Sequence, residues 1–149
     1  MFFKSSNILY FFLFWNFSTM IAQPKIELLG SHQARPGFGA GLRIKIARNG
    51  VTGPLRFVSS IPNGCSINEL SISSAVLSTS ENILRAVWLT APLRDTIVQE
   101  WEMKIPENAK GKYTLNGHLE YFEDGVMKTI PSNLIEIYLT PYFTRYLEN

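Results

Sequence analysis

Residues 96–139 read TIVQEWEMKIPENAKGKYTLNGHLEYFEDGVMKTIPSNLIEIYL, and this stretch decides the fold. Apolar and polar side chains alternate along it, which is the period of two of a half-buried β-strand and not the 3.6-residue period of a helix. We predict three long strands, at Thr96–Ile105, Gly111–Phe122 and Val126–Leu139. The Asp124-Gly125 pair between the last two is a strong signal for a tight hairpin turn.

The first two of these strands each have one largely apolar side. We expect the first to point Ile97, Trp101, Met103 and Ile105 inward, and the second to point Tyr113, Leu115, Gly117, Leu119 and Tyr121 inward. The opposite sides carry most of the charged residues, so we expect those sides to face water.

Shorter strands are expected before this stretch. Turn-forming Gly, Pro and Asn residues separate the expected strands, which are Lys25–Leu29, a strand around Leu42–Ala47, Leu55–Ile61, short irregular strands within Ile67–Thr79 near a sheet edge, and Asn82–Leu89. In the last strand either Leu84, Ala86 and Trp88 or Ile83, Val87 and Leu89 could face inward. Because both sets are apolar, we predict a strand that is central or covered on both sides, and we expect Trp88 or Trp101 at the centre of the core.

These elements predict an all-β fold. They give seven to nine strands with turns every eight to twelve residues and no convincing helical period after the amino-terminal segment. A chain of 149 residues that is 46% hydrophobic can bury one sizeable core and is short for two. We therefore predict one domain, a two-sheet antiparallel β-sandwich.

The pattern resembles the immunoglobulin-like and cohesin-like modules of exported bacterial envelope proteins. The resemblance rests on a break at Ile61-Pro62-Asn63-Gly64, a later strand containing Trp88, and a closing hairpin built from Gly117–Tyr121. It spans roughly Lys25–Leu139 and implies an immunoglobulin-like sandwich. The cysteine pair of antibody domains is absent, because Cys65 is the only cysteine. Similarity of this kind carries fold much better than function.

The amino-terminal 22 residues predict a cleaved signal peptide. Lys4 precedes the apolar run Ile8–Trp15, which has the length of a signal-peptide hydrophobic region and is too short to span a bilayer as a helix. Cleavage after Ala22 leaves a junction that resembles those of exported Gram-negative envelope proteins, although Met20 is large for its position. An uncleaved anchor is the rival interpretation. No cysteine lies near the junction, which disfavours a lipoprotein.

We divide the chain into a signal peptide at 1–22, a sandwich domain at 23–140 and an aromatic tail at 141–149. The expected location is the periplasm, the outer-membrane periphery or the cell exterior. The sequence has 14 basic and 12 acidic residues, and removal of Lys4 with the signal leaves 13 and 12, a net charge of +1. With no long basic block, this balance argues against nucleic-acid binding.

Motifs for catalysis, metals or cofactors are weak. The glycine-rich stretch Arg35–Gly41 runs into a strand and not a helix, so we interpret it as an interstrand loop and not as a phosphate-binding loop. His32, His118 and Cys65 lie in separate regions without the spacing of metal ligands. We predict no metal, no cofactor and no enzyme activity.

Three further arrangements of polar residues could be catalytic. His118 and Glu120 share a strand face, and we predict a solvated pair there and not a proton relay. Asp95 or Asp124 could complete a Ser-His-Asp set, but no Gly-x-Ser-x-Gly elbow is present. The acid pairs Glu100 with Glu102 and Glu120 with Glu123 are expected to face water and not to flank a glycosidase cleft.

The lone cysteine lies in a predicted loop. No histidine or basic residue adjoins Cys65 to lower the pKa of its thiol, so we expect a half-buried structural residue and not a reactive one. A free thiol in an exported protein could also pair between molecules.

Aromatic residues offer two binding hypotheses. Tyr142, Phe143 and Tyr146 in the tail could bind a partner or fold back over the end of the sandwich. Phe122, Tyr138 and one of the two tryptophans of the domain could instead form a flat platform that stacks on sugars.

The sequence therefore favours a non-catalytic accessory module that acts by protein–protein contact in the bacterial envelope. Its partner would be an envelope or outer-membrane protein, or a second copy of the chain joined through strand edges. A carbohydrate-binding module is the alternative, and an enzyme comes third.

Overall fold

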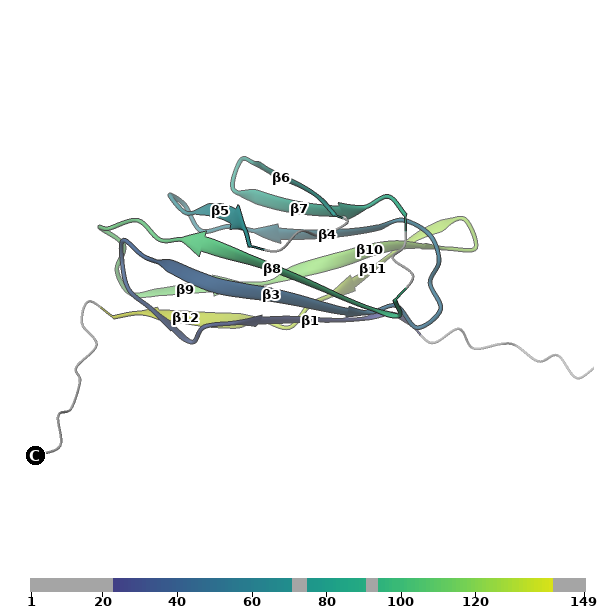
Figure 1. The fold of residues 1–149 in the computed structure, drawn as a ribbon, viewed down its shortest axis with the longest axis horizontal. Helices are drawn as coiled ribbons and strands as arrows, with labels where there is room; N and C mark the ends of the chain where they lie inside the picture. The colour runs from purple at the N-terminus through teal and green to yellow at the C-terminus, as the bar shows by residue number, and fades with distance from the viewer. Residues whose placement is uncertain (1–22, 71–74, 91–93, 141–149) are drawn as a thin grey trace, which may run out of the picture.

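The computed structural model describes residues 23–70, 75–90 and 94–140, which form twelve strands and no helix (Figure 1). The strands are β1 (Lys25–Gly30), β2 (Gln33–Ala34), β3 (Gly39–Ala47), β4 (Leu55–Ser60), β5 (Ser66–Glu69), β6 (Val76–Ser80), β7 (Ile83–Trp88), β8 (Thr96–Lys104), β9 (Lys112–Leu115), β10 (Gly117–Glu123), β11 (Val126–Pro131) and β12 (Ile135–Leu139). Within these ranges there is no helix that is long and apolar enough to cross a membrane.

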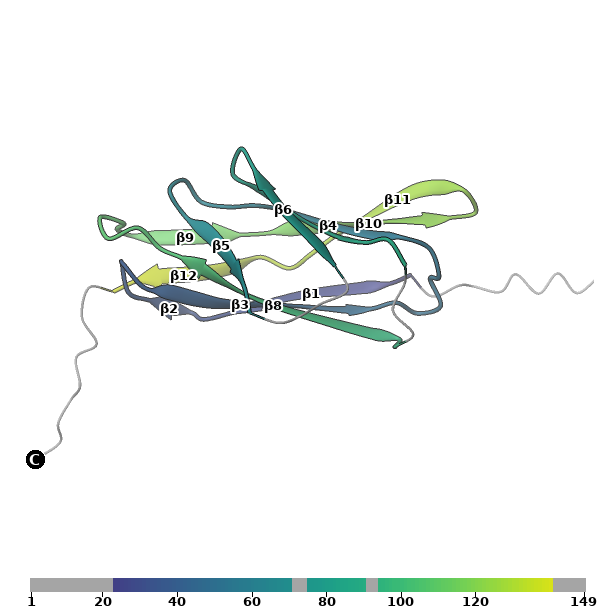
Figure 2. The same cartoon turned by 45° about the horizontal axis from the view of Figure 1, so that its top comes forward.

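The strands form two layers. One sheet has the order β1-β3-β8-β5 and a second has the order β11-β10-β4-β7-β6, while a short third sheet has the order β2-β12-β9. All neighbouring pairs are antiparallel except β2 with β12. Figures 1 and 2 show β3 and β8 in one layer and β4 and β10 in the other. The result is an all-β, sandwich-like fold.

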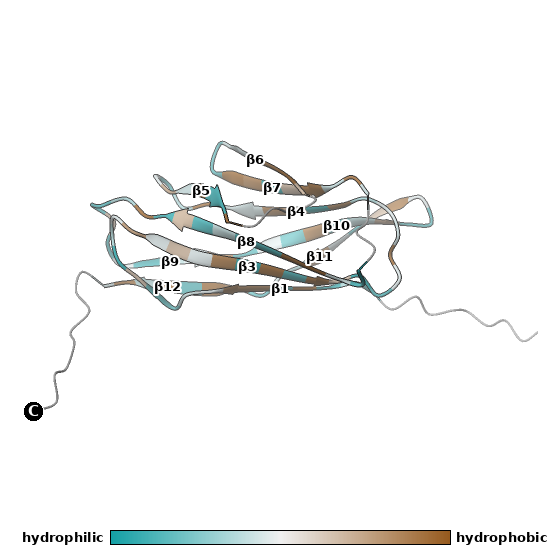
Figure 3. Ribbon diagram, in the orientation of Figure 1, coloured by the Kyte–Doolittle hydropathy of each residue, from teal (hydrophilic) through white to brown (hydrophobic). Residues whose placement is uncertain are grey.

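The core lies between the layers and is apolar. Alternate side chains of β3 and β8 bury Ile44, Ile46, Trp101 and Met103, and those of β4, β7 and β10 bury Phe57, Leu84, Trp88, Leu119 and Tyr121. The rings of Phe57 and Trp101 meet across the core with centroids 6.2 Å apart. Hydrophobic and hydrophilic segments are interspersed along the same strands, as Figure 3 shows.

The predicted alternation is confirmed in the deciding stretch. Ile97, Trp101, Met103 and Ile105 are all buried, as are Leu115, Leu119 and Tyr121. The hairpin turn also lies where it was predicted, with positive φ at both Asp124 and Gly125.

Two of the long predicted strands are each divided in two. The segment 111–122 breaks at Asn116, whose carbonyl oxygen accepts a hydrogen bond from Ser59 Oγ. The segment 126–139 breaks between β11 and β12. Ile130 and Ile135 both pack on the core although they are five positions apart, which would place them on opposite sides of an unbroken strand, so the alternation must be interrupted between them.

Strand β7 has one of the two arrangements that were predicted for it. It lies between β4 and β6, so it is central, and it buries Leu84, Ala86 and Trp88. Its other side is not covered by the residues that the structure describes, because Ile83 and Val87 are half-buried and Leu89 is 70% exposed. Both Trp88 and Trp101 are core residues. The short strands expected within 67–79 are β5 and β6, and both lie at sheet edges.

Candidate functional site

The outer side of the second sheet carries exposed apolar side chains. Because Leu119 and Tyr121 of β10 point inward, the residues between and after them point out. The strand register then aligns outward residues across the sheet, with Phe122 opposite Met127, Glu120 opposite Arg56, Arg56 opposite Val87, and Val87 opposite Val76. We call this surface the Phe122 face, made of Phe122, Met127, Glu120, His118, Arg56, Val87 and Val76.

Three large apolar side chains of the Phe122 face are more than half exposed. The exposed fractions are 52% for Phe122, 53% for Met127 and 58% for Val76, and Val87 between them is half-buried. A hollow of about 250 Å³ lies on this face and is lined by Pro54, Arg56, Val87, Glu120, Phe122 and Met127, among others. Exposed apolar side chains that gather on one face of a sheet are typical of an interaction site.

The charged groups of the Phe122 face are paired with one another. The Glu120 carboxylate accepts a hydrogen bond from Arg56 Nε, and its other oxygen lies 3.1 Å from His118 Nε2. The hydrogen bond from Arg56 lowers the pKa of Glu120, against the opposing effect of burial. Glu120 therefore stays ionised at neutral pH, and the face presents a compensated polar centre among apolar side chains.

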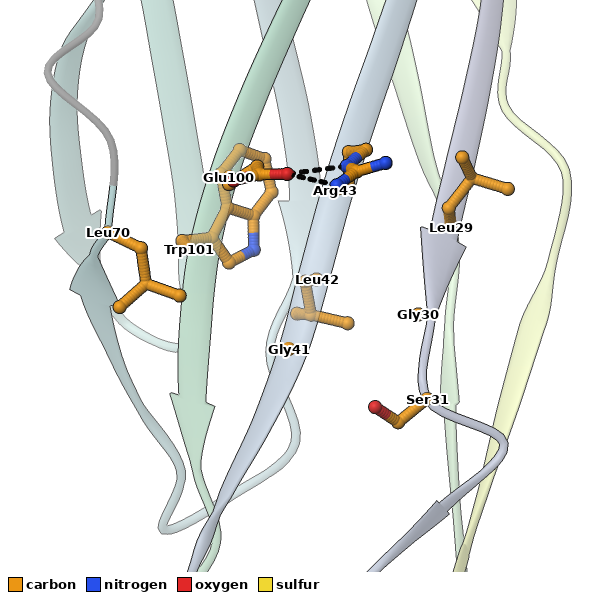
Figure 4. A pocket seen from close by; sticks show the side chains of 9 residues that line it. All are labelled: Leu29, Gly30, Ser31, Gly41, Leu42, Arg43, Leu70, Glu100 and Trp101. Carbon is orange, nitrogen blue, oxygen red and sulfur yellow. Dashed lines mark hydrogen bonds and ion pairs between the residues drawn. The ribbon is translucent and has the colours of Figure 1, made fainter.

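A second hollow lies on the outer side of the first sheet (Figure 4). It has a volume of about 410 Å³, and its lining includes Leu29, Gly41, Arg43, Leu70 and Glu100. Gly41 leaves the floor open, since a Cβ added there would meet no heavy atom within 4 Å. Arg43 Nε donates to Glu100 Oε1 over 2.6 Å at one end of the hollow. No aromatic ring is exposed in this lining, so the hollow offers no stacking surface.

A third hollow lies between β1 and β12. Its volume is about 450 Å³, and His32, Leu134, Glu136 and Tyr138 line it together with other residues. The Tyr138 ring is 50% exposed, and its hydroxyl donates to Glu136 Oε2 over 2.9 Å. Glu136 also forms an ion pair with Lys112, and the hydrogen bond from Lys112 lowers the pKa of Glu136.

The sugar-stacking platform predicted from sequence is wrong as stated. Trp88 and Trp101 are at most 1% exposed, because both occupy inward positions of their strands. Phe122 and Tyr138 are exposed but far apart. Tyr138 is paired with Lys112 of β9. Lys112 precedes Phe122 by ten residues along β9 and β10, and ten residues of extended strand span about 33 Å. They cannot hold one sugar together.

His118 and Glu120 form the predicted pair on the outer side of β10, but the pair is not fully solvated, because the Glu120 side chain is only 14% exposed. Glu100 pairs with Arg43, and the Glu102 carboxylate lies over Gly39. Glu123 lies 3.6 Å from Lys128. Across the described ranges, no three His, Cys, Asp or Glu side chains gather in a way that could hold a metal. The tail residues Tyr142, Phe143 and Tyr146 lie outside the described residues.

Cys65 is half-buried, as predicted. Burial raises the pKa of its thiol, and a hydrogen bond with Tyr113 offsets the effect only in part. The loop at 35–38 also leads directly into β3, as the interstrand interpretation requires.

Sequence reasoning missed Arg56, Val87 and Met127 as surface partners of Phe122 and Glu120. Each lies on a strand whose apolar and polar alternation is visible in the sequence. Their proximity, however, depends on which strands are neighbours and in which register, and one sequence does not give that. The turn at Asp124-Gly125 could have placed Met127 opposite Phe122, because a two-residue hairpin fixes its own register.

No family model and no curated protein sequence matches the chain. Among solved structures it is similar to a GH20 exo-β-N-acetylglucosaminidase from Vibrio harveyi, with a TM-score of 0.46 and 11% identity over 81% of this chain and 19% of that one. An inactive mutant of the same enzyme gives a TM-score of 0.47 and 11% identity over 83% of this chain and 20% of that one.

A further similar structure is the chitin-binding domain of Chi18aC from Streptomyces coelicolor, with a TM-score of 0.45 and 14% identity over 68% of this chain and 97% of that one. The present chain thus spans about one fifth of each glycosidase chain. Likeness at this distance is confined to the course of the strands and carries no argument about a ligand.

Proposed function

We propose that this chain is a non-catalytic binding module that acts by protein–protein contact through the Phe122 face. The observation that carries the proposal is the cluster of exposed Phe122, Met127 and Val76 around the internally paired Arg56 and Glu120. Aromatic and Met side chains are enriched in protein interfaces. Because Glu120 already has its partners, covering the face would not leave its charge unpaired.

We further infer an exported protein with an immunoglobulin-like topology. The topology is supported by β1 and β2, which are consecutive in the chain but join different sheets, with β2 parallel to β12. Export is supported by the sequence pattern of residues 1–22. The partner would then be an envelope or outer-membrane protein met in the periplasm or at the cell surface.

The test is capture of envelope proteins by the wild-type chain and by two variants. Phe122→Ser with Met127→Ser removes two of the three exposed large apolar side chains of the face, and Val98→Ser removes an equally exposed apolar side chain from the outer side of the other sheet. Loss of hot-spot residues costs about 2 kcal/mol or more, which is about 30-fold in affinity. We expect the double variant to lose its partner and Val98→Ser to keep it. Equal capture by all three would refute the proposal.

Carbohydrate binding is the second candidate function, and the hollow between β1 and β12 favours it. Tyr138 offers an exposed ring that could stack on the apolar side of a sugar, and His32 and Glu136 offer hydrogen-bonding groups in the same hollow. The test is titration with a panel of soluble oligosaccharides. The panel includes chitin fragments. Tyr138→Ala should abolish any binding that Phe122→Ser retains, and an unresponsive panel would remove this candidate.

A further inference from the structure

Among the residues that the structure describes, strand β6 forms an open edge of the second sheet. It pairs with β7 on one side and ends the strand order on the other, as its place in Figure 1 shows. A free edge presents unpaired N–H and C=O groups, and natural proteins protect such edges with charged side chains, proline, bulges or very short strands.

The other sheet edges carry such protection, within the part of the chain that the structure describes. Strand β11 contains Lys128 and Pro131, and β5 is four residues long and ends with Glu69. Strand β9 is also four residues long and begins with Lys112, and β2 has two residues. The edge of β1 is capped by a side chain, because the Asn133 amide exchanges two hydrogen bonds with the backbone of Leu28. Strand β6 reads VLSTS and has no charge and no proline.

The hairpin turn shows which groups of β6 point away from β7. Glu81 and Asn82 both have positive φ and form the two-residue turn that joins Ser80 to Ile83. In such a hairpin the residues flanking the turn form a hydrogen-bonded pair, and this pairing then recurs at every second residue. Val76, Ser78 and Ser80 therefore bond to β7, so Leu77 and Thr79 direct their N–H and C=O groups toward the free edge.

We propose that β6 joins two copies of this chain by antiparallel pairing with the same strand of a second copy. A two-fold axis at Ser78 sets Leu77 opposite the partner's Thr79, and Thr79 opposite the partner's Leu77. Each of these pairs exchanges two backbone hydrogen bonds, so four form in total. The side chains at the axis are the small, uncharged Ser78 of both copies. The two sheets become one continuous sheet of ten strands.

A second copy fits this edge better than a free extended peptide does. Two outward-facing residues offer few hydrogen bonds, and a disordered peptide would spend much of that free energy on becoming extended. In a second copy β7 already holds β6 extended. Self-pairing of β11 would instead bring two copies of Lys128 together, with the repulsion that β6 avoids. Because five paired residues bury far less than the roughly 1,600 Å² of a standard interface, the dimer should be weak.

The test is analytical ultracentrifugation of the purified, exported chain over a range of concentrations up to about 1 mM, a range suited to a weak interface. Thr79→Pro removes an outward N–H from each copy and so two of the four hydrogen bonds, while the bonds of Ser78 and Ser80 to β7 remain. Thr79→Val keeps the N–H and is the matched control. We expect the wild type and Thr79→Val to dimerise alike and Thr79→Pro to dimerise at least tenfold more weakly.

Amide hydrogen exchange of the wild type gives a readout that does not depend on the folding of a variant. Exchange at Leu77 and Thr79 should slow as concentration rises, while exchange at Ser78 stays constant. A wild type that stays monomeric, a dimer with unchanged exchange at Leu77 and Thr79, or equal dimerisation by a folded Thr79→Pro would each overturn the proposal. If the wild type is monomeric but binds another protein, and Thr79→Pro loses that binding, then β6 pairs with a strand of the other protein and not with a second copy. None of these results depends on Phe122.

Discussion

For Gly117→Ala, the sequence and the structure predict changes of opposite sign in the free energy of unfolding. Gly117 lies on β10 and its φ is not in the positive range that favours glycine. From sequence alone, alanine should stabilise such a position by about 0.4–1 kcal/mol, because it reduces the conformational entropy of the unfolded chain. The structure predicts destabilisation. A Cβ at this position would lie 2.5 Å from the Val58 carbonyl oxygen and 2.6 Å from two atoms of the Phe57 ring.

The neighbours of Gly117 cannot easily move. Phe57 is fully buried and packs on Trp101, and the Val58 oxygen belongs to the backbone of β4, which pairs with β10. Forcing a methyl group into a packed site costs about 1–3 kcal/mol. After the gain in entropy, we expect Gly117→Ala to lower the free energy of unfolding by about 1–2 kcal/mol.

Gly41→Ala is the matched control, because Gly41 is also a strand glycine without a positive φ and an added Cβ would meet nothing within 4 Å. It should stabilise the protein by about 0.4–1 kcal/mol. Urea unfolding followed by linear extrapolation measures both effects. Phe57→Leu should cost less stability in the Gly117→Ala background than in the wild type, because it removes the two ring atoms nearest to the added Cβ, although the contact with the Val58 oxygen remains. A Gly117→Ala variant as stable as the wild type would refute the packing described here.

Three further predictions follow from single contacts. Asn133→Ala should cost about 1–3 kcal/mol in urea unfolding and speed amide exchange at Leu28, because it uncaps the β1 edge; unchanged exchange would contradict this. The folded-state pKa of Glu120 is lowered, so its stabilising effect is present above the ordinary pKa of about 4.3 and lost as pH falls through the folded value. Glu120→Gln should therefore destabilise the protein at pH 7 and converge with the wild type in acid, and a constant difference in free energy would contradict the ion pairing. Cys65 should react with a thiol reagent at pH 8 at least tenfold more slowly than after unfolding, since burial raises the pKa of its thiol and hinders access; equal rates would show an exposed thiolate.

Much of the fold could be predicted because the strands alternate clearly. Ile97, Trp101 and Met103 recur on one side of their strand, and burial follows from that pattern alone. The tight turn at Asp124-Gly125 was also readable, because this dipeptide tolerates the positive φ values that the turn requires. Local chemistry specified these features.

The candidate site was harder to predict because it depends on which strands are neighbours. The Arg56 and Glu120 pair joins residues 64 positions apart, and Phe122 belongs to the same surface only because β10 lies between β4 and β11. The sugar platform that included a tryptophan was wrongly predicted for a related reason. A large aromatic side chain suits a sugar platform and a core equally well, and only the inward register of Trp88 and Trp101 decides between them.

The two proposed contact surfaces belong to one sheet, and this links their consequences. In the sheet order, β7 and β4 lie between β6 and β10, so pairing of β6 with a second copy would leave both Phe122 faces uncovered. A two-fold axis perpendicular to the joined sheet, as antiparallel pairing at Ser78 allows, would turn both faces to the same side. A surface that repeats its binding site could then engage both faces at once, and the second contact would form at a high effective concentration. An apolar patch of modest size could in this way hold a repetitive envelope surface firmly while binding a single soluble copy of the same partner only weakly.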